Sequence, residues 1–68
     1  MPSVVKVIEL IAESETSWEE AARSAVETAQ KSIHGIKSLY VQDMQAVVKG
    51  GRVDRFRLNV KISFEVDS

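Results

Sequence analysis

Residues 56–66 alternate strictly between apolar and polar side chains, and this pattern constrains the fold more than any other part of the sequence. Alternation with a period of two is typical of a β-strand that buries one face and leaves the other polar. We therefore predict a long antiparallel strand here. Its apolar positions are Phe56, Leu58, Val60, Ile62, Phe64 and Val66.

Two further segments are predicted to be strands. Residues 4–11 form a mostly apolar, β-branched run, and residues 38–48 have the length and composition of a strand. Gly50 and Gly51 separate the second of these from the C-terminal run, and a Gly-Gly pair supplies the positive φ angles of a tight hairpin turn. The last two strands are therefore expected to form a hairpin.

Neither of these two strands has one clearly polar face. In residues 4–11 both alternating sets are apolar, so both faces need cover from a second layer or a neighbouring subunit. In residues 38–48, SLYVQDMQAVV, the two sets do not separate, and we interpret one side as facing the helix and the other as a subunit contact. The apolar residues of the first strand are Val5, Val7 and Ile11 on one face and Val4, Ile8 and Leu10 on the other.

A helix is predicted between the first two strands, after a polar turn at residues 12–17. Ser17 followed by Glu20 fits a capping box, and the same pattern occurs in a frame one residue earlier. An alanine-rich apolar stripe runs on to Ile33, and Gly35 is a natural terminator, which predicts a helix of about sixteen residues. Small side chains let a helix backbone come close, so we expect this helix to lie against a curved sheet.

The predicted order is β–α–β–β in a single α+β domain of residues 1–68. Hairpin strands of about twelve residues extend roughly 40 Å, whereas the helix covers roughly 24 Å. The hairpin must therefore curl or meet other subunits. A chain of 68 residues with no cysteine and one histidine lacks the means to add a disulfide or a Cys/His zinc site, so oligomerisation is the expected remedy for its small core.

Composition argues against several classes of function. The formal net charge of −1 attracts neither nucleic acid nor an anionic membrane. No apolar run is long enough for a membrane helix, and no signal-peptide pattern is present, so we expect a soluble, cytoplasmic protein. His34 lacks a sequence-evident catalytic partner and is interpreted as a cation near the helix C-terminus, so we expect no enzymatic activity. The carboxylates match no EF-hand loop, but they could form a calcium site where copies meet on a symmetry axis.

The whole pattern resembles the dodecin family. The resemblance rests on the order of elements, the helix start TSWEEAA, the QDM element at residues 42–44 and the ending FRLNVKISFEV, and it covers residues 4–66. Order, length and spacing carry it together, since no short motif is diagnostic. It implies a three-stranded antiparallel sheet wrapped around one helix, a hollow homododecamer, and flavin storage without catalysis.

The resemblance also places the family's flavin pocket on the last two strands. A tryptophan that stacks on the flavin in the family would fall at Ser38, and a glutamine at the ring edge would fall at Arg57, so both positions depart from the flavin pattern. The departures resemble the flavin-poor branch that includes calcium dodecins. We therefore expect a shell that binds a small ligand or an ion, with a pocket at Ser38, Tyr40, Gln45 and Arg57 and with Asp43 as a candidate metal ligand.

Two alternatives stay open. Flavin could still bind, with Tyr40 supplying the aromatic face two residues along the same side of the strand. The shell could also be a structural or partner-binding assembly with no small ligand.

Overall fold

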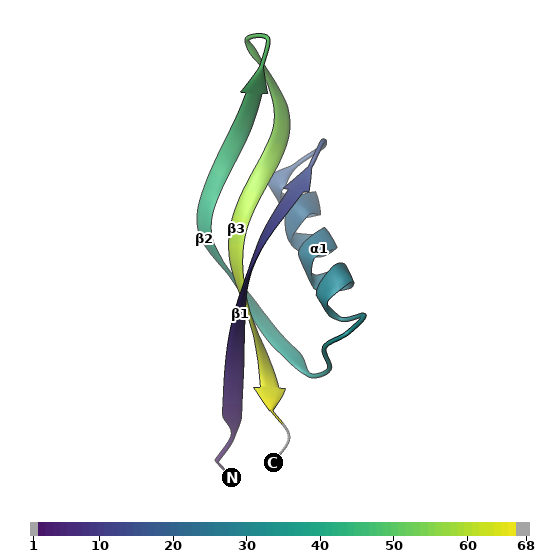
Figure 1. Cartoon of the computed structure of the whole chain (residues 1–68), viewed down its shortest axis with the longest axis vertical. Coiled ribbons are helices and arrows are strands. Elements are labelled where there is room, and N and C mark those ends of the chain that lie inside the picture. The colour runs from purple at the N-terminus through teal and green to yellow at the C-terminus, as the bar shows by residue number, and fades with distance from the viewer. Residues whose placement is uncertain (1, 67–68) are drawn as a thin grey trace.

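The computed structural model describes residues 2–66 as four elements, β1 (Val4–Ser14), α1 (Trp18–Ala29), β2 (Ile36–Lys49) and β3 (Arg52–Val66). β3 is the central strand, and β1 and β2 both pair with it antiparallel. The helix lies beside the middle of the sheet, and the β2–β3 hairpin continues past it (Figure 1). The predicted β–α–β–β order and the three-stranded antiparallel sheet with one helix are confirmed.

The core is one small cluster between α1 and β3. Alanine side chains end at Cβ, so the helix backbone lies close to the central strand, as the alanine stripe predicts. Isoleucine, leucine and tryptophan side chains from the flanking elements pack around the cluster. The fully buried residues are Ala21, Ala25 and Ala29 on the helix and Leu58, Val60 and Ile62 on the strand.

Cross-strand pairing gives the sheet two faces with different cover. The helix-covered face carries the even-numbered residues of β1 and, within residues 56–66, those of β3, which include all of the buried strand residues. We call the opposite side the open face. It carries Val5, Val7, Glu9, Ile11 and Glu13 from β1, and Arg55, Arg57, Asn59, Lys61, Ser63 and Glu65 from β3.

One extra residue in β2 explains why residues 38–48 show no clean alternation. The Cα partners step from Val41 with Val60 to Asp43 with Asn59, so Gln42 has no partner on β3 and forms a β-bulge. Because side chains alternate with a period of two, the extra residue moves every later side chain to the other face. The mixed pattern therefore records a shift of register within the strand.

The bulge gathers polar side chains on the open face. Leu39 and Val41 face the helix side before it, and Met44 and Ala46 face that side after it. A further register shift lies between Ile36 and Ser38 at the start of the strand. The open-face residues of β2 are therefore Ser38, Tyr40, Asp43, Gln45 and Val47.

The helix is shorter than the sequence predicts. Its start is confirmed, since Ser17 Oγ accepts a hydrogen bond from the Glu20 N–H at 3.0 Å. It ends at Ala29 after 12 residues, however, and the prediction of a helix reaching towards Gly35 is wrong. The chain turns earlier because it must pair with β3, where the Gly35 carbonyl accepts from the Glu65 N–H at 3.0 Å.

His34 and Ile33 consequently lie beyond the helix, and the interpretation of His34 as a cation at the helix C-terminus is wrong. The first strand, in contrast, is longer than predicted. It continues through Ala12 and Glu13 to Ser14, because the long β3 offers partners along that whole length. The predicted polar turn therefore shrinks to the residues just before the helix.

The hairpin turn is formed as predicted, with Gly50 at φ 58° and Gly51 at φ 75°. The chain is elongated, with extents of 52 × 20 × 13 Å. It exposes 5148 Å², about 850 Å² more than the roughly 4,300 Å² expected for a compact 7.6 kDa monomer. No helix in residues 2–66 is long and apolar enough to cross a membrane.

Candidate functional site

The residues predicted to form the site all lie on the open face, where they are spread along the β2–β3 pair. We call this row of residues the strip; it consists of Ser38, Tyr40, Asp43, Gln45 and Arg57. In the β2–β3 register, Tyr40 is opposite Lys61 and Asp43 is opposite Asn59, with Gln45 opposite Arg57 in the next row. Ser38 is at the far end of the strip, opposite Ser63. From the Ser38 row to the Arg57 row is six residues along β3, roughly 20 Å. The structure thus brings all five residues onto one face without converging them on one point.

The Ser38 end of the strip is closed by a cross-strand hydrogen bond. The hydroxyl oxygens of Ser38 and Ser63 are 2.6 Å apart, so each serine satisfies the other. Tyr40, in the neighbouring row, leaves 65% of its surface exposed on the open face. This end of the strip therefore offers an accessible aromatic ring in place of a stacked tryptophan.

Arg57 forms an ion pair with Glu13 of β1, a residue that the sequence did not indicate as part of the site. Its Nε donates to Glu13 Oε2 at 2.6 Å, and Nη2 lies 2.6 Å from the same oxygen. Arg55 Nη1 donates to the other carboxylate oxygen, Oε1, at 3.1 Å. This cluster depends on the strand register that places Glu13 opposite Arg57. The sequence of one strand does not reveal its register with another, so the contact could not be predicted.

The two guanidinium groups change the acidity of the carboxylate. The hydrogen bond from Arg57, and after it the one from Arg55, hold the pKa of Glu13 below its ordinary value, against a smaller opposing effect of desolvation. Glu13 is therefore ionised at neutral pH. With its charge balanced in this way, Arg57 is a partnered cation rather than a free one at the strip.

Asp43 and Asn59 form the row with unused oxygen atoms. Asn59 Oδ1 is buried and makes no hydrogen bond with any described residue, and exposed Asp43 is its cross-strand neighbour. A buried acceptor without a partner is unusual in folded proteins. Within residues 2–66, no cluster of three or more His, Cys, Asp or Glu side chains is close enough to hold a metal ion. One chain therefore supplies too few ligands for a complete ion site.

Trp18 supports the strip from the opposite side of the sheet. Its indole N–H donates to the Gln45 carbonyl at 2.8 Å, and its ring meets Phe56 edge to face at a centroid distance of 4.9 Å. The single tryptophan is thus a packing residue that fixes the backbone beneath Gln45, and the structure gives it no position from which to stack on a ligand at the open face.

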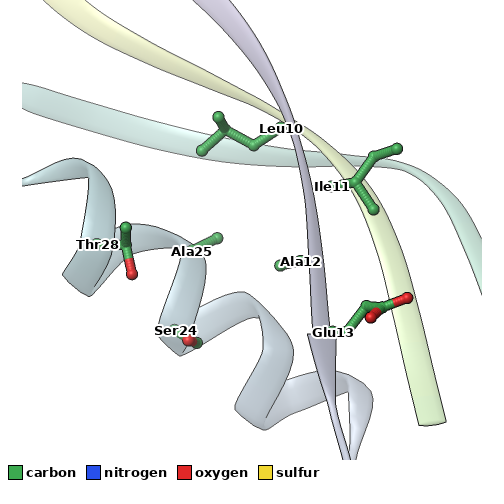
Figure 2. Close-up of a pocket in the computed structure, with 7 residues that line it drawn as sticks. All are labelled: Leu10, Ile11, Ala12, Glu13, Ser24, Ala25 and Thr28. Carbon is green, nitrogen blue, oxygen red and sulfur yellow. The ribbon is translucent and has the colours of Figure 1, made fainter.

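A groove between β1 and α1 lacks the groups needed for chemistry. It is lined by Leu10, Ile11, Ala12 and Glu13 from the strand and by Ser24, Ala25 and Thr28 from the helix. Figure 2 shows Leu10 on one side of the strand and Ile11 and Glu13 on the other, with the Glu13 carboxylate directed away from the helix. No second ionisable residue lines the groove, so the open face remains the candidate site.

Comparison with known proteins gives consistent matches over nearly the whole chain. A family model described as Dodecin matches residues 4–67. Calcium dodecin from Mycobacterium tuberculosis is 42% identical over 66 residues, which cover 94% of this chain and 90% of that protein. These matches come from sequence and carry more than a likeness of fold.

Solved structures match as well. The crystal structure of calcium dodecin from Mycobacterium tuberculosis, described as a calcium-chelating antigen with a novel calcium-binding site, has a TM-score of 0.83 at 35% identity and covers 96% of this chain and 93% of that one. The dodecin from Streptomyces davaonensis has a TM-score of 0.93 at 16% identity and full coverage of both chains. The tt0972 protein from Thermus thermophilus has a TM-score of 0.92 at 21% identity, with 98% of each chain covered. At these identities the last two support the fold alone.

Proposed function

The chain belongs to the dodecin family, and we propose that it is a subunit of a closed homododecameric shell that binds and stores an ion or a small ligand at its open face. Dodecins are non-enzymatic binding proteins, so this chain is not an enzyme. The family also implies a homo-oligomer. An excess of about 850 Å² of surface is close to what one partner contributes to a standard interface, which supports assembly.

Calcium is the first candidate ligand. The observation that carries this proposal is the row in which the Asp43 carboxylate neighbours the unpartnered Asn59 Oδ1. Calcium takes six to eight oxygen ligands, more than this row supplies, so symmetry-related copies would complete the site. A relative at 42% identity is a calcium dodecin, which supports the same ion.

Calorimetry on chelator-treated, reassembled protein tests this proposal. We expect saturable binding of calcium by the wild type and its loss in Asp43→Asn, which keeps the side-chain volume but removes the charge. Asp54→Asn is the matched control, because Asp54 is a carboxylate on the hairpin, beside Lys49 and Arg55. A flat wild-type titration, or Asp43→Asn that binds as the wild type does, would contradict calcium as the ligand.

A flavin is the second candidate, supported by the exposed Tyr40 ring on one of the two strands where the resemblance places the family's flavin pocket. An aromatic stack adds about 0.5–1.5 kcal/mol beyond area burial, so a tyrosine platform could hold a flavin ring. Titration of the wild type into flavin should then quench flavin fluorescence, and Tyr40→Leu should abolish the quenching. If the wild type does not quench but Ser38→Trp/Arg57→Gln does, the pocket is present and its natural residues exclude flavin.

Native mass spectrometry of freshly purified protein reports assembly and bound ligand together. We expect a single species with the mass of twelve chains and additional mass from the ligand. Twelve chains without additional mass, together with flat calcium and flavin titrations, would leave a structural assembly as the function. A monomer would contradict the shell itself.

A further inference from the structure

Arg57 lies between two carboxylates on the open face. It is on the central strand, opposite Glu13 of β1 and opposite Gln45 of β2, and Asp43 is in the next row of β2. Such a diagonal neighbour in an antiparallel pair is about 7–8 Å away, which is within reach of a long side chain. The Arg57 guanidinium can therefore pair with Glu13 on one side or with Asp43 on the other.

The guanidinium is found on the Glu13 side. Nε and Nη2 of Arg57 both contact Glu13 Oε2 at 2.6 Å, and every ion pair of Arg57 within residues 2–66 is with Glu13. Asp43 is exposed and forms no ion pair in the same part of the chain. Glu13 therefore holds the arginine on the β1 side, and the charge of the Asp43 carboxylate remains available.

The second arginine at Glu13 has another partner. Arg55 Nε lies 3.6 Å from Asp54 Oδ2, a contact that does not depend on Glu13. Asp54 lines the same pocket as Arg57, but it also lies 4.0 Å from Lys49 Nζ and so already has two cations beside it. Without Glu13, the carboxylate within reach of Arg57 that has no cation among the described residues is Asp43.

A guanidinium on Asp43 would change what the strip binds. The row of Asp43 and Asn59 presents a carboxylate and a buried amide oxygen without a hydrogen-bond partner in residues 2–66, and divalent cations such as calcium prefer oxygen ligands. An arginine paired with Asp43 would cancel its charge, occupy its oxygens and repel an incoming cation. The charge presented by this row thus depends on where Arg57 is held.

We propose that Glu13 is a positioning residue that keeps the strip selective for cations, because it holds Arg57 on the β1 side and leaves Asp43 available to a divalent cation. This inference rests on the proposed function and names a residue that controls the same site. Glu13 acts through Arg57 and contacts no ligand itself. Its own side chain is fixed at both oxygens, since Arg55 Nη1 donates to Oε1 at 3.1 Å.

Calcium calorimetry on chelator-treated, reassembled protein compares Glu13→Gln with Glu9→Gln. Both glutamates lie on the open face of β1, two residues on either side of Ile11, which is opposite Asn59. Each substitution removes one negative charge at the same spacing from that row, but only Glu13 holds an arginine. We expect Glu13→Gln to raise the Kd for calcium at least about tenfold, and Glu9→Gln to raise it less than about threefold. Equal effects of the two substitutions would overturn the proposal.

Removal of the arginine separates positioning from general damage to the site. Glu13→Gln/Arg57→Gln should recover calcium affinity to within about threefold of the wild type, because no guanidinium remains to pair with Asp43. A purely structural role of Glu13 predicts the opposite, since two substitutions should then damage the site at least as much as one. A double variant as weak as Glu13→Gln would therefore overturn the proposal.

Crystal structures without calcium judge the position of Arg57 independently of the ligand. In the wild type Arg57 should contact Glu13, and in Glu13→Gln a guanidinium nitrogen should lie within about 4 Å of an Asp43 oxygen. An Arg57 that stays on the β1 side in the variant, or that already contacts Asp43 in the wild type, overturns the positioning role. A wild type that binds no calcium contradicts the proposed ligand, whereas a shifted Arg57 in the variant would still support the role of Glu13.

Discussion

The two faces of the sheet are built from the same central strand but depend on different partners. On the helix-covered face, Leu58, Val60 and Ile62 are 0–1% exposed, because three alanines of α1 close over them. On the open face, no helix or strand of residues 2–66 packs over the intervening Asn59 and Lys61. One face is thus completed within the monomer, and the other is available for copies and ligands. Alternate residues of β3 therefore contribute to the core of the monomer and to the candidate site.

Substitution of one isoleucine on each face gives the largest expected effect. Ile62→Ala should lower the free energy of unfolding by about 2–5 kcal/mol, because it opens a cavity in the small core. Ile11→Ala, where the isoleucine is 66% exposed on the open face, should cost less than about 1 kcal/mol. Denaturant unfolding followed by circular dichroism at one protein concentration measures both. Equal costs would show that assembly buries the open face as tightly as the helix buries the core.

Among the elements of the fold, a strand with one buried face was the easiest to predict from the sequence. Strict alternation defines β3, the Gly50-Gly51 pair defines the turn, and Ser17 with Glu20 defines the helix start. The end of the helix was not predictable from its stripe. The apolar pattern continues to Ile33, but tertiary pairing with β3 ends the helix at Ala29. The start of this helix is specified by local residues, whereas its end depends on pairing with a strand that lies far away in the sequence.

The sequence predicts a set of residues for the candidate site, and that set stays a prediction, but the sequence does not reveal how these residues are arranged. Ser38, Tyr40, Asp43 and Gln45 do share a face, and they do so only because the Gln42 bulge shifts the register between them. A bulge adds one residue and leaves no signature in composition. The Glu13–Arg57 contact is equally hidden, since it joins residues 44 positions apart whose pairing depends on the β1–β3 register.

Deletions in β2 test whether the bulge separates the two faces. Deleting Gln42 should leave every other side chain on its present face, because Val41 and Asp43 already alternate. Deleting Met44 instead should move Asp43 to the helix-covered face beside Leu58, at a further cost of about 1–3 kcal/mol for burying a polar group. Comparison of the two unfolding curves measures this difference. Deletions of equal cost would mean that register in β2 is not fixed by the helix-covered face.

Trp18 packs on the helix-covered face and donates a hydrogen bond to the backbone of Gln45, whose side chain lies on the open face. Removal of the indole N–H should lower the stability of the protein moderately. Trp18→Phe keeps an aromatic ring against Phe56 but leaves the Gln45 carbonyl without its hydrogen bond. We expect a loss of about 0.5–1.5 kcal/mol in unfolding free energy, measured by circular dichroism because the fluorophore is lost. Trp18→Leu should cost more, since it also removes the edge-to-face contact. A neutral Trp18→Phe would show that the helix does not hold the backbone of the strip.

The Glu13 cluster should contribute the smallest effect, because it is an ion pair at the surface of a single chain. Its arginine partners lower the pKa of Glu13, so its contribution is present above the ordinary value of 4.5 and is lost as pH falls through the lowered folded pKa. Glu13→Gln should therefore reduce stability at neutral pH and flatten the decline of stability below about pH 4.5. Glu9→Gln, on the same strand and face, should leave that decline in place. An unchanged acid profile in Glu13→Gln would mean that Arg55 and Arg57 do not act on this carboxylate, and that Arg57 is free to serve the strip beside Gln45.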